Sequence, residues 1–402
     1  MYTREQFDDV GGGWLALLFG GIAMLCGLLL AAVRWQDIDT TTLFWTNRDF
    51  ANYWIGSRLA LSGKALELFR GHEIYFAHMQ AAFSADYPWH SWSYPPHYLL
   101  VILPVGLFPY LPAAIAFELT TLAFFLHAVS LAARRVSGLI VLLVIPAVAC
   151  NLLTVQNGFL TSALMLYGLT LRDRRPILAG IAIGLLTVKP QLGLLLPILL
   201  LYERRWTMIF SAVATTSMLI AISTLVFGVE AWTGYISKTW PYQITVMRDF
   251  TGIFPHMMPS VFGSMRSLGF DADKANLFHL PVALMSLVTF IWSLFHLRNL
   301  TVRGFSLLFA TFMISPYSFV YDLPALSVAA ALTVTRGDRY ASEGIDVTFL
   351  LMGLVCIMPL LGIVLSLNGL PIAPAVLALG WIAMLARQRG TAPLTPSSPP
   401  TG

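Results

Sequence analysis

Few side chains in this sequence could exchange a proton within apolar surroundings, and Asp49 is the most prominent of them. It stands in the stretch Asn-Arg-Asp-Phe-Ala-Asn-Tyr-Trp at residues 47–54, shortly after the first long apolar run. A carboxylate where an apolar helix meets water is partly desolvated, which favours proton transfer. Position alone favours the cap described next, but together with the motifs further along the chain it leads us to predict that Asp49 is a catalytic base. The competing interpretation is a helix cap, because Asp is common at helix starts.

Lys189 combines a charge with a break in the backbone. Pro190 follows it, and proline frees a backbone carbonyl and interrupts a helix. A Lys at a helix centre costs roughly 2.5 to 3.5 kcal/mol on insertion scales, so such a residue usually faces a cavity or a partner. We predict that Lys189 binds an anionic phosphate, with Arg58 or His97 as helpers. The alternatives are a Lys189 that snorkels at a loop and a His97 that is only interfacial.

Sugar hydroxyls need hydrogen-bonding partners, and two further motifs offer them. Gln156 and Asn157 present paired amides, although a polar turn between helices has the same composition. Asp322 follows two tyrosines at a break in an apolar run, although an Asp at a helix start looks similar. Glu118 lies inside an apolar run, where we expect it to pair within a helix bundle. The predicted residues for sugar or acceptor binding are Tyr53, Trp54, Tyr94, Gln156, Asn157, Tyr317, Tyr321 and Asp322.

Residue types that hold metals are not spaced for a metal site. His72, Glu73 and His78 lack the spacing of a zinc-binding helix. Residues 37–39, Asp-Ile-Asp, are similar to the metal-binding motif of nucleotide-sugar enzymes, but no alternation of strands and helices surrounds them. The three cysteines lie inside apolar segments, and the sequence has neither a P-loop nor a dinucleotide fingerprint. We predict no metal and no cofactor.

The composition determines what kind of fold must position these groups. The chain has 402 residues, of which 57% are hydrophobic and 11% charged, and its mean hydropathy is +0.74. Soluble domains carry about 25% charged residues. We therefore predict an all-α polytopic membrane protein in contact with membrane lipids. The net charge of +4 does not indicate a nucleic-acid partner, because Lys and Arg fall in short clusters between apolar runs.

Apolar runs long enough for membrane helices recur along residues 1–386, which we interpret as one integral-membrane domain of about twelve (11–13) helices. The first, residues 14–33, is bounded by tryptophans and follows a polar head unlike a signal peptide. Two amphiphilic stretches, about 36–96 and 229–277, are predicted loops, and residues 387–402 a disordered cytoplasmic tail. The later runs cover about 97–110, 112–133, 138–150, 158–171, 176–188, 191–202, 206–228, 278–297, 304–315, 319–335, 346–367 and 371–386.

Basic clusters at alternate junctions predict the orientation. They are Arg134-Arg135, Arg172 with Arg174-Arg175, Arg204-Arg205, Arg298 with Arg303, Arg336 with Arg339, and Arg387 with Arg389. The positive-inside rule places them in the cytoplasm and the polar motifs outside. For Asp49 to share that outer side, residues 97–133 must cross the membrane only once. Either residues 97–110 are re-entrant, or residues 138–150 form a half-helix that turns back; the sequence allows both.

Together, the motifs resemble glycosyltransferase family 87 of the GT-C superfamily, which includes the mycobacterial polyprenyl-phosphate-mannose-dependent mannosyltransferases. Each motif is short, but they follow in order from about residue 47 to 323. The motifs are Asp49-Phe50 with Tyr53-Trp54, Tyr94-Pro95-Pro96, Pro104 with Pro109-Tyr110, Gln156-Asn157-Gly158, Ala179-Gly180 with Lys189-Pro190, and Ser315-Pro316-Tyr317 with Tyr321-Asp322-Leu323.

The resemblance implies a GT-C bundle with a large first outer loop and an enzyme of the cytoplasmic (inner) membrane whose active site lies on the outer, periplasmic side. Its expected donor is a polyprenyl phosphate monosaccharide that carries a hexose, with mannose as the favoured sugar. Its expected acceptor is a glycolipid or glycan, and the transfer is expected to invert the anomeric carbon. The acid that such enzymes require in the first outer loop corresponds to Asp49. A later histidine considered as base in the mycobacterial branch has no counterpart here, where Tyr317, Tyr321 and Asp322 stand instead. The base therefore lies at Asp49 or near Asp322.

Two other functions are compatible with a polytopic chain. A transporter or flippase for a lipid-linked sugar also needs broken helices and buried charges. However, the two halves of this sequence show no inverted repeat, and the aromatic loop after the first helix suits an acceptor-binding enzyme better. A non-catalytic scaffold for polysaccharide assembly would not depend on Asp49.

Overall fold

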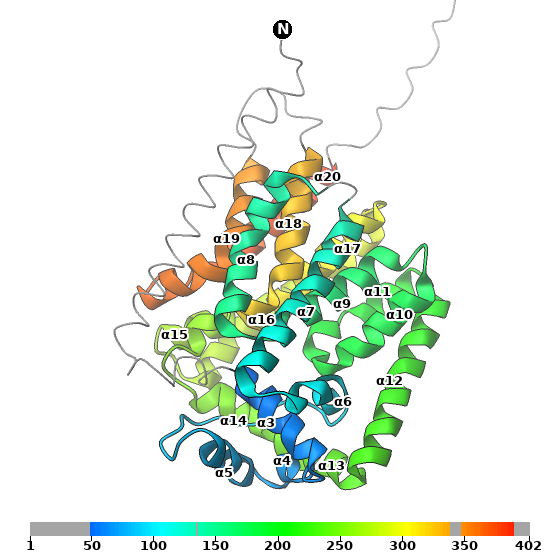
Figure 1. Cartoon of the computed structure of the whole chain (residues 1–402). Helices are drawn as coiled ribbons and strands as arrows, with labels where there is room; N and C mark the ends of the chain where they lie inside the picture. The colour runs from blue at the N-terminus through cyan, green and yellow to red at the C-terminus, as the bar shows by residue number, and fades with distance from the viewer. Residues whose placement is uncertain (1–48, 134–135, 338–346, 390–402) are drawn as a thin grey trace, which may run out of the picture.

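The computed structural model describes residues 49–133, 136–337 and 347–389, and every regular element in these ranges is a helix (Figure 1). The predicted first helix at 14–33, the Asp-Ile-Asp motif and the end of the tail lie outside the described residues. The described part confirms the prediction of an all-helical protein.

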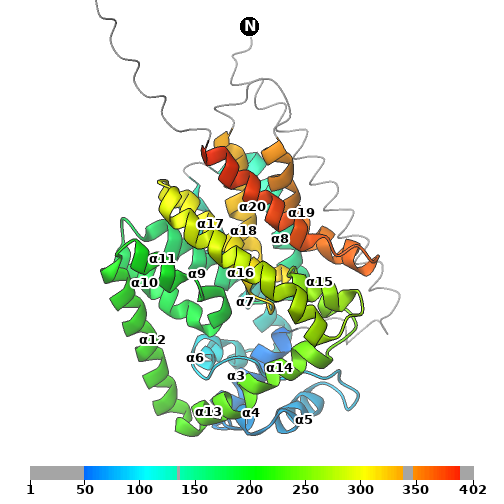
Figure 2. The same ribbon diagram turned by 180° about the vertical axis from the view of Figure 1, so that it is seen from behind.

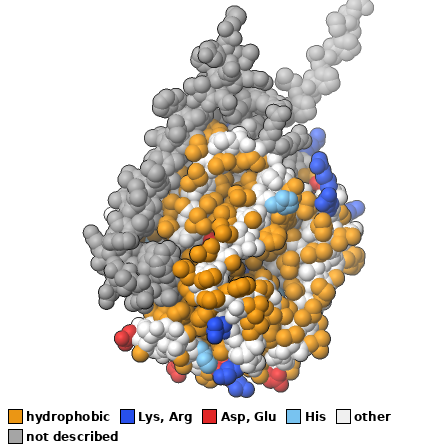
Figure 3. All heavy atoms as spheres, in the orientation of Figure 1, with side chains coloured by type: hydrophobic (Ala, Val, Ile, Leu, Met, Phe, Trp, Pro, Cys, Tyr) orange, Lys and Arg blue, Asp and Glu red, His pale blue; other side chains and the backbone are white. Residues whose placement is uncertain are grey.

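Four helices in these ranges are long and apolar enough to cross a membrane: α7 (Tyr110–Ala132), α12 (Trp206–Phe227), α16 (Ala272–His296) and α19 (Val347–Leu367). At 1.5 Å per residue the shortest, of 21 residues, extends about 31 Å, the thickness of a hydrocarbon core. Figure 3 shows the corresponding surface, where hydrophobic side chains cover the middle of the face and Lys and Arg lie toward its margins. The fold is that of a membrane protein; the count of twelve spans remains a prediction.

Shorter apolar helices account for most of the other predicted runs. They are α8 (Gly138–Thr154), α9 (Gly158–Leu171), α10 (Pro176–Leu185), α11 (Leu196–Tyr202), α17 (Leu300–Ile314), α18 (Pro324–Gly337) and α20 (Ala373–Arg389). The last continues past residue 387, where we expected the disordered tail to begin. Helix α16 starts six residues before the predicted run, because Asp271 accepts a hydrogen bond from the Lys274 N–H and caps it.

Residues 97–110, for which the sequence left the membrane topology open, do not form a full span. It contains α6 (Tyr98–Ile102) and the 3₁₀ helix η1 (Leu103–Leu107), too few residues to cross a bilayer. Ser57 holds it against the first predicted loop by donating to the Leu103 carbonyl at 2.8 Å and accepting from the Gly106 N–H at 2.9 Å. Helix α8 is continuous over 17 residues. Residues 98–107 are therefore too short for a span, and residues 138–154 form one helix; the choice between the two topologies stays a prediction.

The two predicted loops are themselves helical and lie together at one end of the molecule (Figures 1 and 2). The first contains α3 (Phe50–Leu61), α4 (Glu67–Arg70) and α5 (His72–Ala82). The second contains α13 (Val229–Gly234), the π-helical turn η4 (Tyr235–Thr239), α14 (Trp240–Asp249), the 3₁₀ helix η5 (Pro255–Met257) and α15 (Val261–Ser267). We call the two loops the cap.

Contacts between side chains of the two loops join the cap. The Trp89 indole donates to the Tyr242 hydroxyl at 3.1 Å, and the His72 ring stacks on that of Tyr242. Lys238 donates to the Arg70 carbonyl at 2.5 Å. The two loops therefore form one unit although they are far apart in sequence; Lys238 and Arg70 are separated by 168 residues.

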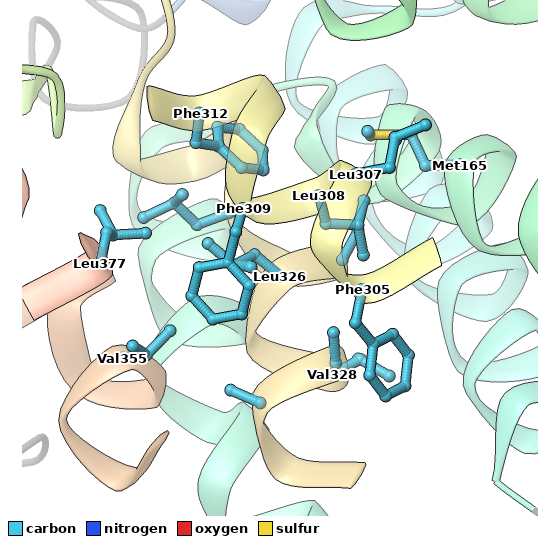
Figure 4. Packing of buried hydrophobic residues seen from close by; sticks show 14 of the residues in the cluster. Met165, Phe305, Leu307, Leu308, Phe309, Phe312, Leu326, Val328, Val355 and Leu377 are labelled. Carbon is cyan, nitrogen blue, oxygen red and sulfur yellow. The ribbon is translucent and has the colours of Figure 1, made fainter. Parts of the chain in front are cut away.

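The membrane-facing bundle is centred on α17 and α18. Figure 4 shows Phe305, Leu308, Phe309 and Phe312 of α17 packed among side chains of α18, α19, α20 and α9. Both helices are buried nearly all round, which is the expected state of an apolar helix at the centre of a bundle. This rigid centre supports the segment 315–323, which reaches the site described below.

At the opposite end of the bundle from the cap, three arginines converge on Glu203. Its carboxylate lies 3.1 Å from Arg172, 3.4 Å from Arg205 and 3.7 Å from Arg303, and its side chain is 2% exposed. Arg205 also pairs with Asp173. The predicted grouping of these arginines at one side of the membrane agrees with this arrangement, whereas the role of Glu203 was not predicted.

Candidate active site

A cavity of about 1060 Å³ lies between the cap and the bundle. Segments from both loops and from three breaks in the bundle line it. Its polar lining residues are Asp49, Asn52, His90, Ser91, Ser93, Tyr94, Thr154, Gln156, Lys189, Gln191, Tyr235, Gln243, Tyr317 and Tyr321. Its apolar wall includes Leu194, Trp240, Ile244, Val246, Met247, Phe250, Ile253, Phe254 and Met257. A volume of this size suits a ligand with several ring-sized groups.

Asp49 is the only acidic residue among the described residues that line this cavity. It precedes α3, and its backbone carbonyl accepts from the Asn52 N–H at 3.0 Å. Its side chain does not cap the helix. Instead, Oδ2 accepts a hydrogen bond from the Gln156 amide, and no described residue donates to Oδ1. Among the described residues, the carboxylate is therefore held through one oxygen only.

The corner between α8 and α9 presents Gln156 to Asp49. Val155, at this corner, has φ = 50°, a left-handed conformation that is costly for a β-branched residue. Gly158, at the start of α9, leaves space for the Tyr321 carbonyl oxygen, with which a side-chain Cβ would collide. Asn151 also donates to that oxygen at 2.9 Å. Glycine is thus required for the close approach of this corner to the segment 315–323.

Lys189 and Asp322 form a buried ion pair beneath the cavity. Lys189 Nζ lies 2.6 Å from Asp322 Oδ1, and the two side chains are 6% and 0% exposed. Asp322 Oδ2 accepts from the Phe319 N–H at 3.2 Å. Lys189 also contacts Asn157 Oδ1 at 3.4 Å and the face of the Tyr321 ring at 4.8 Å. Both oxygens of Asp322 are engaged, whereas Lys189 itself lines the cavity.

Three of the predicted site residues, Arg58, Trp54 and His97, do not line the cavity. Arg58 is exposed and lies over the Trp54 ring at 4.8 Å, and the Trp54 indole donates to the Phe108 carbonyl. Trp54 and Arg58 are four residues apart and share one face of α3. Asp49 and Tyr53, also four apart, share a different face.

His97, the other predicted helper of Lys189, is buried in the wall between α6 and its neighbours. Its ring lies 3.3 Å from the Thr187 hydroxyl and stacks on that of Trp232. Neither His97 nor Arg58 is therefore placed to contact a ligand in the cavity.

Two other predicted residues, Tyr53 and Asn157, lie directly behind the cavity wall. Tyr53 is fully buried and donates to Gln156 Oε1 at 2.6 Å. Asn157 is also fully buried and lies 3.4 Å from the Tyr98 hydroxyl. Each of them contacts a residue that lines the cavity, Gln156 in the case of Tyr53 and Lys189 in the case of Asn157.

Two features could not be identified from local sequence: the surroundings of Glu118 and the apolar wall of the cavity. The expected partner of Glu118 is absent among the described residues: both carboxylate oxygens are buried without a hydrogen bond. The apolar wall from α14 carries no motif, although Trp240, Ile244 and Met247 recur at spacings of four and three residues, the pattern of one helix face. That spacing was the available signal for this wall.

Comparison with known proteins agrees with the chemistry of the cavity. A sequence model of glycosyltransferase family 87 matches residues 92–316, more than half of the chain. The matched range includes Tyr94, Gln156 and Lys189, whereas Asp49 and Asp322 lie outside it. No curated protein and no solved structure matches the chain. The chain belongs to glycosyltransferase family 87 and is a membrane-embedded glycosyltransferase.

Proposed function

We propose that this glycosyltransferase transfers a hexose from a polyprenyl phosphate monosaccharide to a glycolipid or glycan acceptor on the outer face of the cytoplasmic membrane. Mannose is the hexose that we favour. One observation carries the proposal. Among the described residues that line the cavity, Asp49 is the only acidic side chain and Lys189 is the only lysine. Glycosyl transfer from a lipid phosphate needs a base for the acceptor and a positive charge for the leaving phosphate.

In the proposed reaction Asp49 takes the proton from an acceptor hydroxyl while that oxygen attacks the anomeric carbon of the donor. The bond between the anomeric carbon and the phosphate oxygen breaks, and the lipid phosphate leaves with the bonding electrons. Inversion of the anomeric carbon follows from attack opposite the leaving group. A positioned general base contributes roughly 100-fold to 10,000-fold in rate.

Lys189 would neutralise the phosphate as it leaves. Its ammonium group has three N–H donors, of which Asp322 and Asn157 occupy two. The third is available for the phosphate, and the pair with Asp322 holds the ammonium at the cavity wall. Because a lysine can supply the positive charge, this reaction does not require a metal ion.

The apolar wall suits the first isoprene units of the donor. Trp240 and Ile244 line the cavity and are each 60% exposed, so the wall continues from the cavity to the outer surface of α14. An isoprenoid chain could leave the cavity along this surface toward lipid. This continuity supports a lipid-linked donor over a water-soluble nucleotide sugar.

The test is incubation of the purified protein with a panel of polyprenyl phosphate sugars and total membrane lipid, followed by mass spectrometry of new glycolipids. We expect a hexose-bearing product with the wild type and with Asp86→Asn, a control that removes an exposed acid outside the cavity. Asp49→Asn should give little product. Failure of every polyprenyl phosphate sugar in this panel, with folded protein, would overturn the proposed donor class.

A further inference from the structure

A chain of hydrogen bonds runs from the cavity wall to the carboxylate of Asp49. Tyr94, which lines the cavity, has its hydroxyl 2.9 Å from that of Tyr53. The Tyr53 hydroxyl lies 2.6 Å from Gln156 Oε1, and Gln156 Nε2 bonds to Asp49 Oδ2. The four side chains come from α3 and the residue before it, from the loop before α6 and from the corner between α8 and α9.

The chemistry of these groups fixes the direction of each bond. An ionised carboxylate only accepts, so Gln156 must turn its NH₂ group to Asp49 and its carbonyl oxygen to Tyr53. That oxygen also only accepts, so the single hydroxyl proton of Tyr53 is used there. Tyr94 must therefore donate to Tyr53, and toward the cavity its oxygen can only accept. Burial raises the pKa of both Tyr53 and Tyr94 well above the ordinary value, so both hydroxyls keep their protons at neutral pH.

Packing leaves Tyr53 little freedom. Its side chain is fully buried, and its ring centroid lies 5.5 Å from those of Tyr94, Tyr98 and Phe117. It lies one helical turn after Asp49, the residue that directly precedes α3. Gln156 is 2% exposed. The Gln156 Oε1 also accepts from the Asn157 N–H at 3.4 Å, so the amide cannot flip without breaking its bonds to Tyr53, Asp49 and Asn157.

We propose that Tyr53 and Gln156 are positioning residues for Asp49, and that Tyr94 accepts a hydrogen bond from a sugar hydroxyl. Tyr53 fixes the Gln156 amide so that its N–H faces Oδ2 of Asp49, which leaves Oδ1 for the acceptor proton. This inference rests on the proposed role of Asp49 as the base. It differs from our expectation from the sequence that Tyr53 and Gln156 bind the sugar directly.

The decisive variant is Tyr53→Phe, which removes the hydroxyl and keeps the ring. Only the long bond from the Asn157 N–H, at 3.4 Å, then holds the Gln156 carbonyl oxygen, so the amide turns that oxygen to Asp49 more readily, which disfavours the carboxylate form. We expect kcat to fall about tenfold to a hundredfold, the effect of losing one hydrogen bond in a buried network. The KM for the donor should stay unchanged, and the acidic limb of the pH profile of kcat/KM should move to higher pH. Gln156→Glu, which replaces the N–H by an acceptor at nearly constant size, should move that limb further.

The matched control is Tyr75→Phe. Tyr75 is another fully buried phenol of the cap; it donates to Asn52 at 2.8 Å and, among the described residues, makes no hydrogen bond to Gln156 or Asp49. It should leave the acidic limb in place, so a general effect of losing a cap hydroxyl is distinguished from positioning. If Tyr53→Phe does not yield folded protein, Gln156→Glu carries the same test.

The outcomes separate this inference from the proposed function. Near-normal transfer by Asp49→Asn removes the base and the positioning role with it. An inactive Asp49→Asn together with an acidic limb that neither Tyr53→Phe nor Gln156→Glu displaces overturns the positioning role alone. A limb displaced by both variants and not by Tyr75→Phe supports it.

Discussion

Removal of the Lys189 ammonium should separate its contribution to the fold from its proposed contribution to donor binding. In Lys189→Ala the Asp322 carboxylate, which is 0% exposed, loses the cation 2.6 Å away. Breaking a buried ion pair by removing one partner costs about 3 to 5 kcal/mol, because the remaining charge is uncompensated. With a shift of about 2 to 4 °C per kcal/mol for larger domains, the melting temperature should fall by on the order of 10 °C.

A second variant should avoid the loss of stability expected for Lys189→Ala without restoring the positive charge of Lys189. Lys189→Met with Asp322→Asn replaces the ion pair by uncharged side chains, which removes the uncompensated buried carboxylate that destabilises Lys189→Ala. The amide oxygen that Asp322→Asn introduces can still accept from the Phe319 N–H, as Asp322 Oδ2 does at 3.2 Å in the wild type. This double variant should melt close to the wild type.

The assay is a thermal melt in detergent together with donor saturation curves. If Lys189 binds the donor phosphate, the double variant should be stable and yet show strongly weakened donor use, while Lys189→Arg should retain part of it. A double variant with wild-type donor dependence would refute the phosphate role. A wild-type melting temperature for Lys189→Ala would refute the reasoning about the buried pair.

Three further predictions concern the base, the orientation and the close packing. Asp49→Asn should melt like the wild type and lower transfer by roughly 100-fold to 10,000-fold, whereas near-normal turnover would direct attention to other groups. After the native cysteines are replaced, a cysteine beside Arg204 should be shielded from an impermeant thiol reagent outside intact cells and one near Thr251 should react; labelling at 204 would reverse the orientation. Gly158→Ala should lower the melting temperature strongly because its Cβ would collide with a backbone carbonyl, whereas Gly138→Ala, which enters open space, should not; equal melting of the two would contradict the packing.

The sequence predicted the helices better than it predicted what faces the cavity. Apolar runs and prolines are local signals, so the bounds of α9 and α12 agree with the predicted runs to within a residue. The chemistry around Lys189 could be suspected, because a charge next to Pro190 is unusual in an apolar run. Its partner Asp322 is 133 residues away, and no local pattern identifies a contact at that distance.

The faces of short helices were the main difficulty. In α3 the register places Asp49 and Tyr53 at or behind the cavity but Trp54 and Arg58 on another face, and composition alone does not distinguish these faces. A hydrophobic stripe would normally separate them, but α3 is apolar nearly all round. Its packing against α6, η1 and α7, which only the fold provides, decides the matter.

The ion pairs around Glu203 imply that its arginines serve at two different times. Glu203 follows Arg172 by 31 positions and precedes Arg303 by 100, so the first pair forms only after α10 and α11 have been synthesised and the second only after α12 to α16. Under the predicted orientation the arginines also act during insertion, when a guanidinium group whose partner has not yet been synthesised is a cytoplasmic topology signal, to which acidic residues contribute little. After assembly the same charges fasten the ends of α9, α11 and α17 to one another. The charges that direct insertion under this orientation are thus buried or half-buried side chains of the finished protein.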